Sequence, residues 1–208
     1  MFSARGLYAI TDGPRPDLRN AVEAALAGGA CVVQYRDKTD EQARRRAEAA
    51  MLRELCAEHG VPLVINDDVA LAIQCRAAGV HLGAGDADIA TARKILGEKA
   101  IIGVSCYDSM QRARDAVRRG ASYVAFGAFF PSLSKPRARS ANPDILRTSK
   151  LLGVPRVAIG GITPDNARIL INAGADCVAV ISSLFGAADI KAEALRFSRL
   201  FSDPTRQP

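Results

Sequence analysis

Several polar side chains in this sequence stand directly after short apolar runs. The segment Gln34-Tyr35-Arg36-Asp37-Lys38 follows the run 31–33, and Asn66-Asp67-Asp68 follows the run 61–65. The same pattern recurs after 101–104 and 157–159, where the next residues are Ser105 and Gly160-Gly161. In a parallel α/β barrel, residues at the carboxyl ends of the strands build the active site. The spacing therefore predicts that these residues meet at one end of such a barrel.

The first of these segments has the composition of a binding site for an anionic group. Side chains alternate between the two faces of a strand, so Gln34, Arg36 and Lys38 share one face. Two cations on one face suit the charge of a diphosphate, although a solvated pair of charges would have the same sequence. An inward-facing glutamine is costly to bury without a hydrogen-bond partner, which favours a binding site.

Two aspartates indicate a metal site beside these cations. Asp67 and Asp86 end or follow the third and fourth predicted strands, which are neighbours in a barrel, so their carboxylates can converge. Two carboxylates, water and a substrate diphosphate commonly hold Mg²⁺. A lone aspartate at such a junction more often caps the following helix. The pairing on adjacent strands, beside a cationic cluster, favours Mg²⁺.

A second anion site is predicted across the mouth of the barrel. Gly160-Gly161-Ile162 and Ile181-Ser182-Ser183 follow the seventh and eighth strands, where barrels commonly bind phosphate through backbone N–H groups. These glycines could instead serve only a tight turn. The longest predicted loop, 127–141, contains Pro131-Ser132-Leu133-Ser134-Lys135. Long loops in compact domains are often lids or binding loops, and its hydroxyls and ammonium group suit phosphorylated ligands. A solvated basic loop is the alternative.

The elements that must position these residues follow from hydrophobic periodicity. Short β-branched runs alternate with longer amphipathic segments, a pattern typical of βα units around a parallel sheet. Strands are predicted near 7–11, 31–35, 62–65, 79–82, 100–104, 122–126, 155–159 and 177–181. Helices are predicted near 17–28, 40–58, 68–77, 88–96, 109–119, 142–151, 164–173 and 188–201. Eight such pairs predict one α/β domain, a single (β/α)8 TIM barrel over 1–201, with 202–208 as a tail.

Composition narrows the class of protein. The chain has 208 residues, a net charge of +6 and five cysteines without paired C-x-x-C spacing, which favours reduced core thiols. No signal-like or membrane-spanning run is present, so we expect a cytoplasmic protein without a membrane partner. Arg44-Arg45-Arg46 fan around a helix and there is no tryptophan, so the basic helices are interpreted as solvated faces rather than a nucleic-acid site.

The motifs together resemble those of the thiamine-phosphate synthase family, over nearly the whole chain. The resemblance rests on Leu7-Tyr8-Ala9-Ile10-Thr11-Asp12, Gln34-x-Arg36-x-Lys38, Asn66-Asp67-Asp68, Gly79-Val80-His81-Leu82-Gly83, Gly103-Val104-Ser105, Pro131-Ser132-Leu133-Ser134-Lys135, Ile159-Gly160-Gly161-Ile162 and Val180-Ile181-Ser182. The chain departs from the family pattern at Ala84, where glutamine is usual, and at Ser132 and Ser134, where threonines are usual.

The resemblance implies a TIM-barrel transferase that joins hydroxymethylpyrimidine diphosphate to a thiazole phosphate and releases pyrophosphate with Mg²⁺. It implies that the pyrimidine diphosphate is held by Gln34, Tyr35, Arg36, Asp37, Lys38, Asn66, Ser105 and Lys135. It implies that the thiazole phosphate is held by Ser132, Leu133, Ser134, Gly161, Ile181 and Ser182, and the metal by Asp67 and Asp86.

The implied chemistry is ionisation rather than acid–base catalysis. An electron-rich aminopyrimidine can expel pyrophosphate to leave a stabilised cation, and Arg36, Lys38 and Lys135 would stabilise the departing charge. A histidine near a strand end is more often a hydrogen-bonded structural residue than a catalytic one, and His81 is interpreted in this way. The sequence leaves two alternative functions. One is that of a related thiazole tautomerase, which needs no diphosphate site, and the other is that of a non-catalytic protein that binds phosphorylated metabolites.

Overall fold

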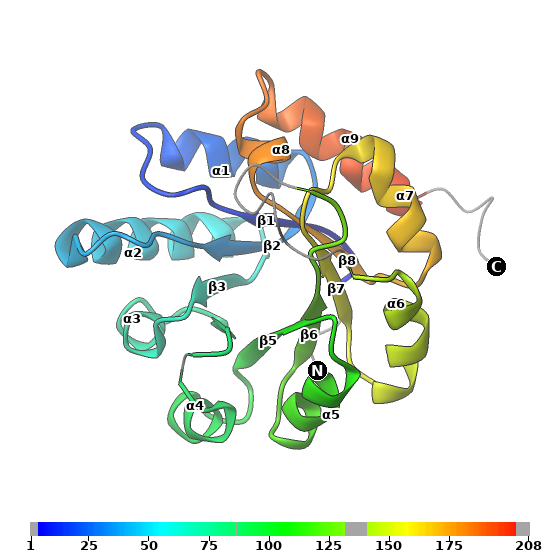
Figure 1. The fold of residues 1–208 in the computed structure, drawn as a ribbon. Coiled ribbons are helices and arrows are strands. Elements are labelled where there is room, and N and C mark those ends of the chain that lie inside the picture. The colour runs from blue at the N-terminus through cyan, green and yellow to red at the C-terminus, as the bar shows by residue number, and fades with distance from the viewer. Residues whose placement is uncertain (1–3, 86, 132–140, 203–208) are drawn as a thin grey trace.

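Eight parallel strands close into a barrel in the order in which they occur in the chain, with β1 hydrogen-bonded to both β2 and β8. Figure 1 shows the strands at the centre and the helices in a ring around them. The structure is a computed structural model, and it describes residues 4–85, 87–131 and 141–202. The predicted single (β/α)8 barrel is confirmed.

The strands are short and lie where the apolar runs predicted them. They are β1 (Gly6–Ile10), β2 (Ala30–Tyr35), β3 (Leu63–Asn66), β4 (Gly79–Leu82), β5 (Ile101–Tyr107), β6 (Tyr123–Phe126), β7 (Arg156–Ile159) and β8 (Cys177–Val180). The register between β5 and β6 shifts between Ser105 and Tyr107. The strand β5 continues past its predicted end at residue 104 as far as Tyr107, which has a positive φ of 56°.

The helices cover the outside of the barrel. They are α1 (Leu18–Ala27), α2 (Gln42–Glu58), α3 (Val69–Gln74), α4 (Ile89–Leu96), α5 (Met110–Arg118), α6 (Asp144–Thr148), α7 (Pro164–Asn172), α8 (Ser182–Phe185) and α9 (Ile190–Ser202), with a 3-10 turn η1 (Ser149–Leu152). The predicted helix 142–151 is therefore divided into α6 and η1. The short helix α8 was not predicted, because four residues give no measurable periodicity.

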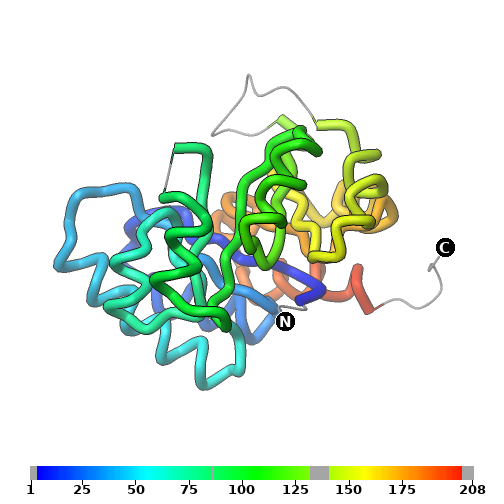
Figure 2. The backbone as a smooth tube through the Cα atoms, turned by 90° about the horizontal axis from the view of Figure 1, so that it is seen from below, coloured from blue at the N-terminus to red at the C-terminus, as the bar shows by residue number. Residues whose placement is uncertain are grey.

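Two apolar layers hold the barrel together. The inner layer fills the barrel and includes Tyr8, Val32, Val64, Tyr123 and Val157. The outer layer lies between the strands and the ring of helices. Figure 2 shows the backbone from below, with helical coils along the outside of the molecule. This double burial explains why the strands are continuous apolar runs, as expected for parallel strands covered on both faces.

The three arginines fan around α2 as predicted, but the interpretation of the basic helices as solvated faces fits only Arg46 and not Arg44 or Arg45. The side chains of Arg44 and Arg45 are 26% and 18% exposed, and they pair with Asp37 and Asp68 respectively. Arg46 is exposed and bonds only to Gln42 of its own helix among the described residues. Helical neighbours point about 100° apart, so three consecutive arginines cannot share one environment.

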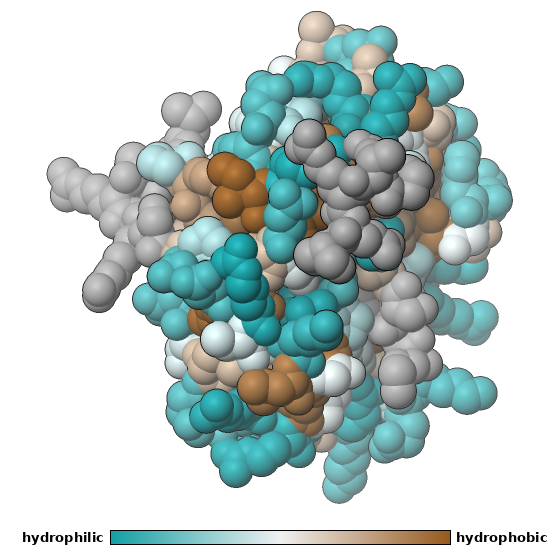
Figure 3. Space-filling view, turned by 90° about the vertical axis from the view of Figure 1, so that its right-hand side faces the viewer, coloured by the Kyte–Doolittle hydropathy of each residue, from teal (hydrophilic) through white to brown (hydrophobic). Residues whose placement is uncertain are grey.

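The surface and the cysteines agree with the composition. Figure 3 shows one side of the molecule, where hydrophilic residues predominate and hydrophobic residues form separate small patches.

All five cysteines are unpaired, and burial raises the pKa of the Cys56 and Cys106 thiols to about 12. Within the described ranges, no helix has the length and apolar character that crossing a bilayer requires.

Candidate active site

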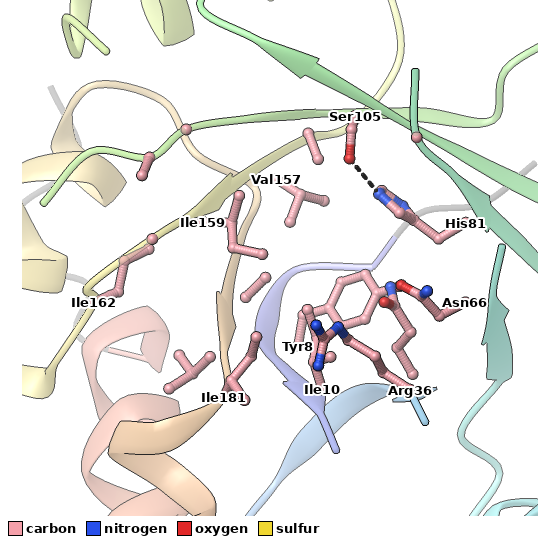
Figure 4. A pocket seen from close by; sticks show the side chains of 18 of the residues that line it. Tyr8, Ile10, Arg36, Asn66, His81, Ser105, Val157, Ile159, Ile162 and Ile181 are labelled. Carbon is pink, nitrogen blue, oxygen red and sulfur yellow. Dashed lines mark hydrogen bonds between the residues drawn. The ribbon is translucent and has the colours of Figure 1, made fainter. Parts of the chain in front are cut away.

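A cavity of about 1090 Å³ opens at the carboxyl ends of the strands. Figure 4 shows that its two sides differ in character. Its polar side is formed by Arg36, which follows β2, and by Asn66, His81 and Ser105 of β3, β4 and β5. The opposite side is apolar and comes from β7, β8 and the residues that follow them, with Val157, Ile159, Ile162 and Ile181.

The segment after β2 places its alternate side chains in this cavity, as predicted. Gln34, Arg36 and Lys38 all line it. The Arg36 guanidinium has no hydrogen bond or ion pair with any described residue, although the residue is half-buried. Lys38 Nζ lies 3.6 Å from Asp67 Oδ2. A half-buried cation without a protein partner is a ready binding group for an anionic ligand.

Tyr35 and Asp37 do not line the cavity, because strand residues alternate between faces. The Tyr35 hydroxyl donates to Glu48 Oε2 at 2.7 Å, on the helix side of the strand. The Asp37 carboxylate is fully buried and lies 2.6 Å from Arg44 Nη1. The resemblance implied substrate contacts for both residues, but the structure places their side chains behind the cavity wall.

A chain of hydrogen bonds crosses the barrel beneath the cavity and joins five strands. Gln34 Nε2 donates to the Tyr8 hydroxyl at 2.8 Å, which lies 2.7 Å from the Tyr123 hydroxyl. The Tyr123 oxygen lies 2.9 Å from His81 Nδ1, and His81 Nε2 lies 2.9 Å from Ser105 Oγ. The chain therefore connects Gln34 to Ser105 through three residues that the sequence analysis did not count as site residues.

One hydrogen bond in this chain has a fixed direction. An amide nitrogen only donates, so the Tyr8 hydroxyl oxygen accepts from Gln34. Each ring nitrogen of His81 shares a hydrogen bond with one hydroxyl, Nδ1 with Tyr123 and Nε2 with Ser105. Burial raises the pKa of both tyrosines well above the usual range, so both stay neutral hydroxyls. Ser105 also lines the cavity, where its hydroxyl can meet a ligand.

Glycine at position 103 makes room for this chain. A Cβ on Gly103 would lie 2.0 Å from the Tyr123 ring carbon Cζ, which real contacts do not allow. The missing side chain on β5 is thus complementary to a large side chain on β6. Alternation along β1 and β6 places Tyr8 and Tyr123 at inward positions and was the available signal. It does not tell which inward side chains from different strands contact each other.

Asn66 and Asp67 line the cavity at the end of β3. Asp67 has a positive φ of 62°, its N–H donates to the His81 carbonyl at 2.8 Å, and its side chain is 33% exposed. Asp86, the second predicted metal ligand, lies outside the described residues. Within 4–85, 87–131 and 141–202, no group of three or more His, Cys, Asp or Glu side chains forms a metal site.

The predicted second anion site also reaches the cavity. Gly161, Ile181 and Ser182 line it together. Ser182 begins the short helix α8, whose first N–H groups have no partner within the helix. The other residues predicted here, Ser132, Leu133, Ser134 and Lys135, lie outside the described residues.

Gly161 allows a close approach of two loops. Its φ is +62°, and an added Cβ would lie 2.3 Å from the Pro131 carbonyl oxygen and 2.7 Å from the Phe130 carbonyl oxygen. The N–H of Phe130 donates to the carbonyl of Gly160 at 3.1 Å, which fixes the start of the 127–141 loop on the end of β7.

Gly161→Ala is therefore expected to lower the free energy of unfolding more than Gly153→Ala. Gly153 also has a positive φ, +71°, but nothing lies within 4 Å of its added Cβ. Both changes carry the left-handed backbone cost of about 1–2 kcal/mol, and only Gly161→Ala adds an overpacking cost of about 1–3 kcal/mol. Urea unfolding of the two variants measures the difference, and equal losses would contradict the close approach.

Comparison with known proteins identifies the family. Residues 7–184 match the family model described as thiamine monophosphate synthase. The thiamine-phosphate synthase of Nitrosococcus oceani is 53% identical, covering 96% of this chain and 94% of the relative, and that of Marinobacter nauticus is 52% identical, covering 95% and 91%. The solved structure of thiamine phosphate pyrophosphorylase from Pyrococcus furiosus superposes with a TM-score of 0.87 at 33% identity, covering 96% of each chain. The chain belongs to the thiamine-phosphate synthase family and is a transferase of thiamine biosynthesis.

Proposed function

We propose that the protein joins hydroxymethylpyrimidine diphosphate to a thiazole phosphate, with Mg²⁺, and releases pyrophosphate. The observation that carries this proposal is the division of one cavity into a cationic, hydrogen-bonding side and an apolar side that is continuous with Gly161 and Ser182. A volume of about 1090 Å³ is at the upper end of ordinary ligand pockets, so it has room for two substrates at once.

The hydrogen-bond chain suits an aminopyrimidine ring. The amide oxygen of Gln34 has no partner among the described residues and accepts from an exocyclic amine. Ser105, whose hydroxyl bonds to His81 and lines the cavity, would donate to a ring nitrogen. The two groups together favour a ring that presents both a donor and an acceptor. The carbonyl of Ser105 is fixed in turn by Arg112 Nε at 2.7 Å.

The diphosphate of this substrate belongs beside Arg36 and Lys38. Both cations would stabilise charge that grows as the bond to the leaving group breaks, and Lys135 is proposed to act with them. Asp67 fits a Mg²⁺ ligand, because its carboxylate is partly exposed at the cavity edge and carboxylate oxygen is what Mg²⁺ prefers. With Asp86 as second ligand, the bound ion would neutralise part of the diphosphate charge.

The residues present suit ionisation of the pyrimidine better than nucleophilic catalysis. None of the five cysteines lines the cavity, and the two buried tyrosines stay neutral. The protein's part is to hold the ring, stabilise pyrophosphate and present the thiazole nitrogen to the cation. Val157, Ile159 and Ile162 exclude water from the apolar side, which protects a reactive cation from hydrolysis.

Ser182→Ala is expected to raise KM for the thiazole phosphate about five-fold and to leave kcat unchanged. The reason is that its phosphate keeps the same charge throughout the reaction, so a lost neutral hydrogen bond of about 1 kcal/mol weakens ground and transition states equally. Steady-state kinetics with each substrate varied in turn measures this. A raised KM for the pyrimidine diphosphate alone would mean that the two anion sites were assigned the wrong way round.

Release of pyrophosphate tests the proposed reaction as a whole. Purified protein with Mg²⁺ is expected to release pyrophosphate only when both substrates are present. Turnover of the thiazole phosphate alone would instead support a tautomerase. Binding of both substrates without any turnover would support a non-catalytic binding protein.

A further inference from the structure

The loop that carries Arg36 and Lys38 is held by a side chain that points away from both. Asp37 lies between them in sequence, and its carboxylate is 0% exposed on the outer side of the barrel wall. Its Oδ1 accepts the N–H of Thr39 at 2.8 Å, which folds the loop back on itself. The position of the Asp37 side chain therefore constrains the short backbone segment from which the Arg36 and Lys38 side chains project.

Arg44, near the start of α2, is the principal partner of this buried carboxylate. Its Nη1 lies 2.6 Å from Asp37 Oδ2, and its Nη2 donates to Thr39 Oγ1 at 2.7 Å. The same guanidinium bonds to Glu48 Oε2 of its own helix at 3.0 Å and to Oε2 of Glu41, the residue before that helix, at 3.0 Å. One side chain thus joins the loop after β2 to α2 by several bonds in a fixed planar geometry.

Glu48 extends this connection to the strand itself. It accepts the Tyr35 hydroxyl at 2.7 Å, so residues before and after Arg36 are both tied to α2. Burial raises the pKa of the Asp37 carboxyl, but the Thr39 N–H and the Arg44 guanidinium outweigh it and hold that pKa below its usual range. Asp37 is therefore a buried carboxylate anion, and such an anion is strongly destabilising once its partner is removed.

We propose that Arg44 is a positioning residue for the diphosphate site: through Asp37 it fixes the loop that aims Arg36 and Lys38 into the cavity. The inference rests on the proposed function of those two cations. Without Arg44, the Asp37 carboxylate turns towards water to regain solvation, and the backbone on either side turns with it. Arg44 itself does not line the cavity, so it acts only through the loop.

The test compares Arg44→Met with Arg46→Met. Arg46 lies two residues further along α2 and is exposed, so its replacement removes the same charge and adds the same side chain without touching the loop. Arg44→Met is expected to lower kcat ~10-fold, the usual scale for losing a group that orients another, because the two cations act on charge that develops as the bond to the diphosphate breaks. KM for the thiazole phosphate is expected to stay unchanged, and Arg46→Met is expected to match the unaltered protein.

Two further variants keep the test decisive if Arg44→Met folds poorly. Arg44→Lys keeps the charge and is expected to restore part of kcat. Asp37→Asn keeps the shape and the bond from Thr39 N–H but loses the ion pair, so it is expected to lower kcat as well without leaving a buried charge. Combining Asp37→Asn with Arg44→Met is expected to lower kcat no further than the larger single effect, because both remove one interaction.

Hydrogen exchange supplies a readout that does not depend on activity. Segment 36–40 is expected to exchange faster in Arg44→Met than in Arg46→Met, while strands β6 and β7 keep their protection. An Arg44→Met protein with a lower melting temperature but with unchanged kcat and unchanged exchange of 36–40 would overturn the proposal, because Arg44 would then be merely structural. If the unaltered protein itself neither binds inorganic pyrophosphate nor makes product, the proposed function fails instead.

Discussion

Arg36→Ala is expected to lower kcat ~100-fold, the scale seen when one preorganised donor to a developing negative charge is lost. The Arg36 side chain reaches the cavity without a partner among the described residues, so its removal leaves the fold's own hydrogen bonds intact. The effect falls on kcat because the diphosphate gains charge only as its bond to the pyrimidine breaks. Steady-state kinetics with both substrates measures it.

Two variants sharpen this result. Lys38→Ala is expected to lower kcat less, because Lys38 is 63% exposed and shares its charge with Asp67. Arg114→Ala removes an exposed cation from α5, outside the cavity, and is expected to leave both kinetic constants unchanged. If Arg36→Ala raised KM for the thiazole phosphate and left kcat intact, Arg36 would belong to the other anion site.

Asp67→Asn is expected to lower turnover about 10- to 100-fold and to shift the Mg²⁺ requirement to higher concentration. Asparagine keeps the size of the side chain but loses the charge that a hard cation prefers, and changes at metal sites commonly cost this much. Titration of activity with Mg²⁺ measures both effects. Circular dichroism checks that the variant keeps its secondary structure. This is expected, because asparagine tolerates the positive φ of 62° that this position requires.

The matched control for Asp67→Asn is Asp88→Asn. Asp88 caps α4 by accepting the N–H of Thr91, and asparagine caps helices about as well as aspartate. Its replacement is expected to leave activity and the Mg²⁺ requirement unchanged. Full activity of Asp67→Asn, or of the unaltered protein in excess chelator, would exclude the proposed metal site.

The fold was predictable because its signals are local and repeated. Each βα unit has a buried strand and an amphipathic helix, so each apolar run predicts one strand without information from the rest of the chain. Alternation then placed Gln34, Arg36 and Lys38 on the inner face, and the structure confirms that they line one cavity. The same alternation places Tyr35 and Asp37 outside, where the resemblance alone had implied substrate contacts.

The hydrogen-bond chain was not predictable from the same signals. Tyr8 and Tyr123 are 115 residues apart in sequence and meet only because β1 and β6 close around one interior. The fit of Tyr123 against Gly103 depends on the space between two neighbouring strands, which a single strand pattern does not report. The pairing of Arg44 with Asp37 likewise depends on how the start of α2 packs beside the loop after β2.

The most direct measurement is product analysis by mass spectrometry. Purified protein, hydroxymethylpyrimidine diphosphate, the thiazole phosphate and Mg²⁺ are incubated together, with Arg36→Ala and a chelated sample alongside. Thiamine phosphate and pyrophosphate are expected in equal amounts, with far less of both in the two comparison samples. Pyrophosphate without thiamine phosphate, or thiamine phosphate formed equally well by Arg36→Ala and in chelator, would contradict the assignment of the cavity to this reaction.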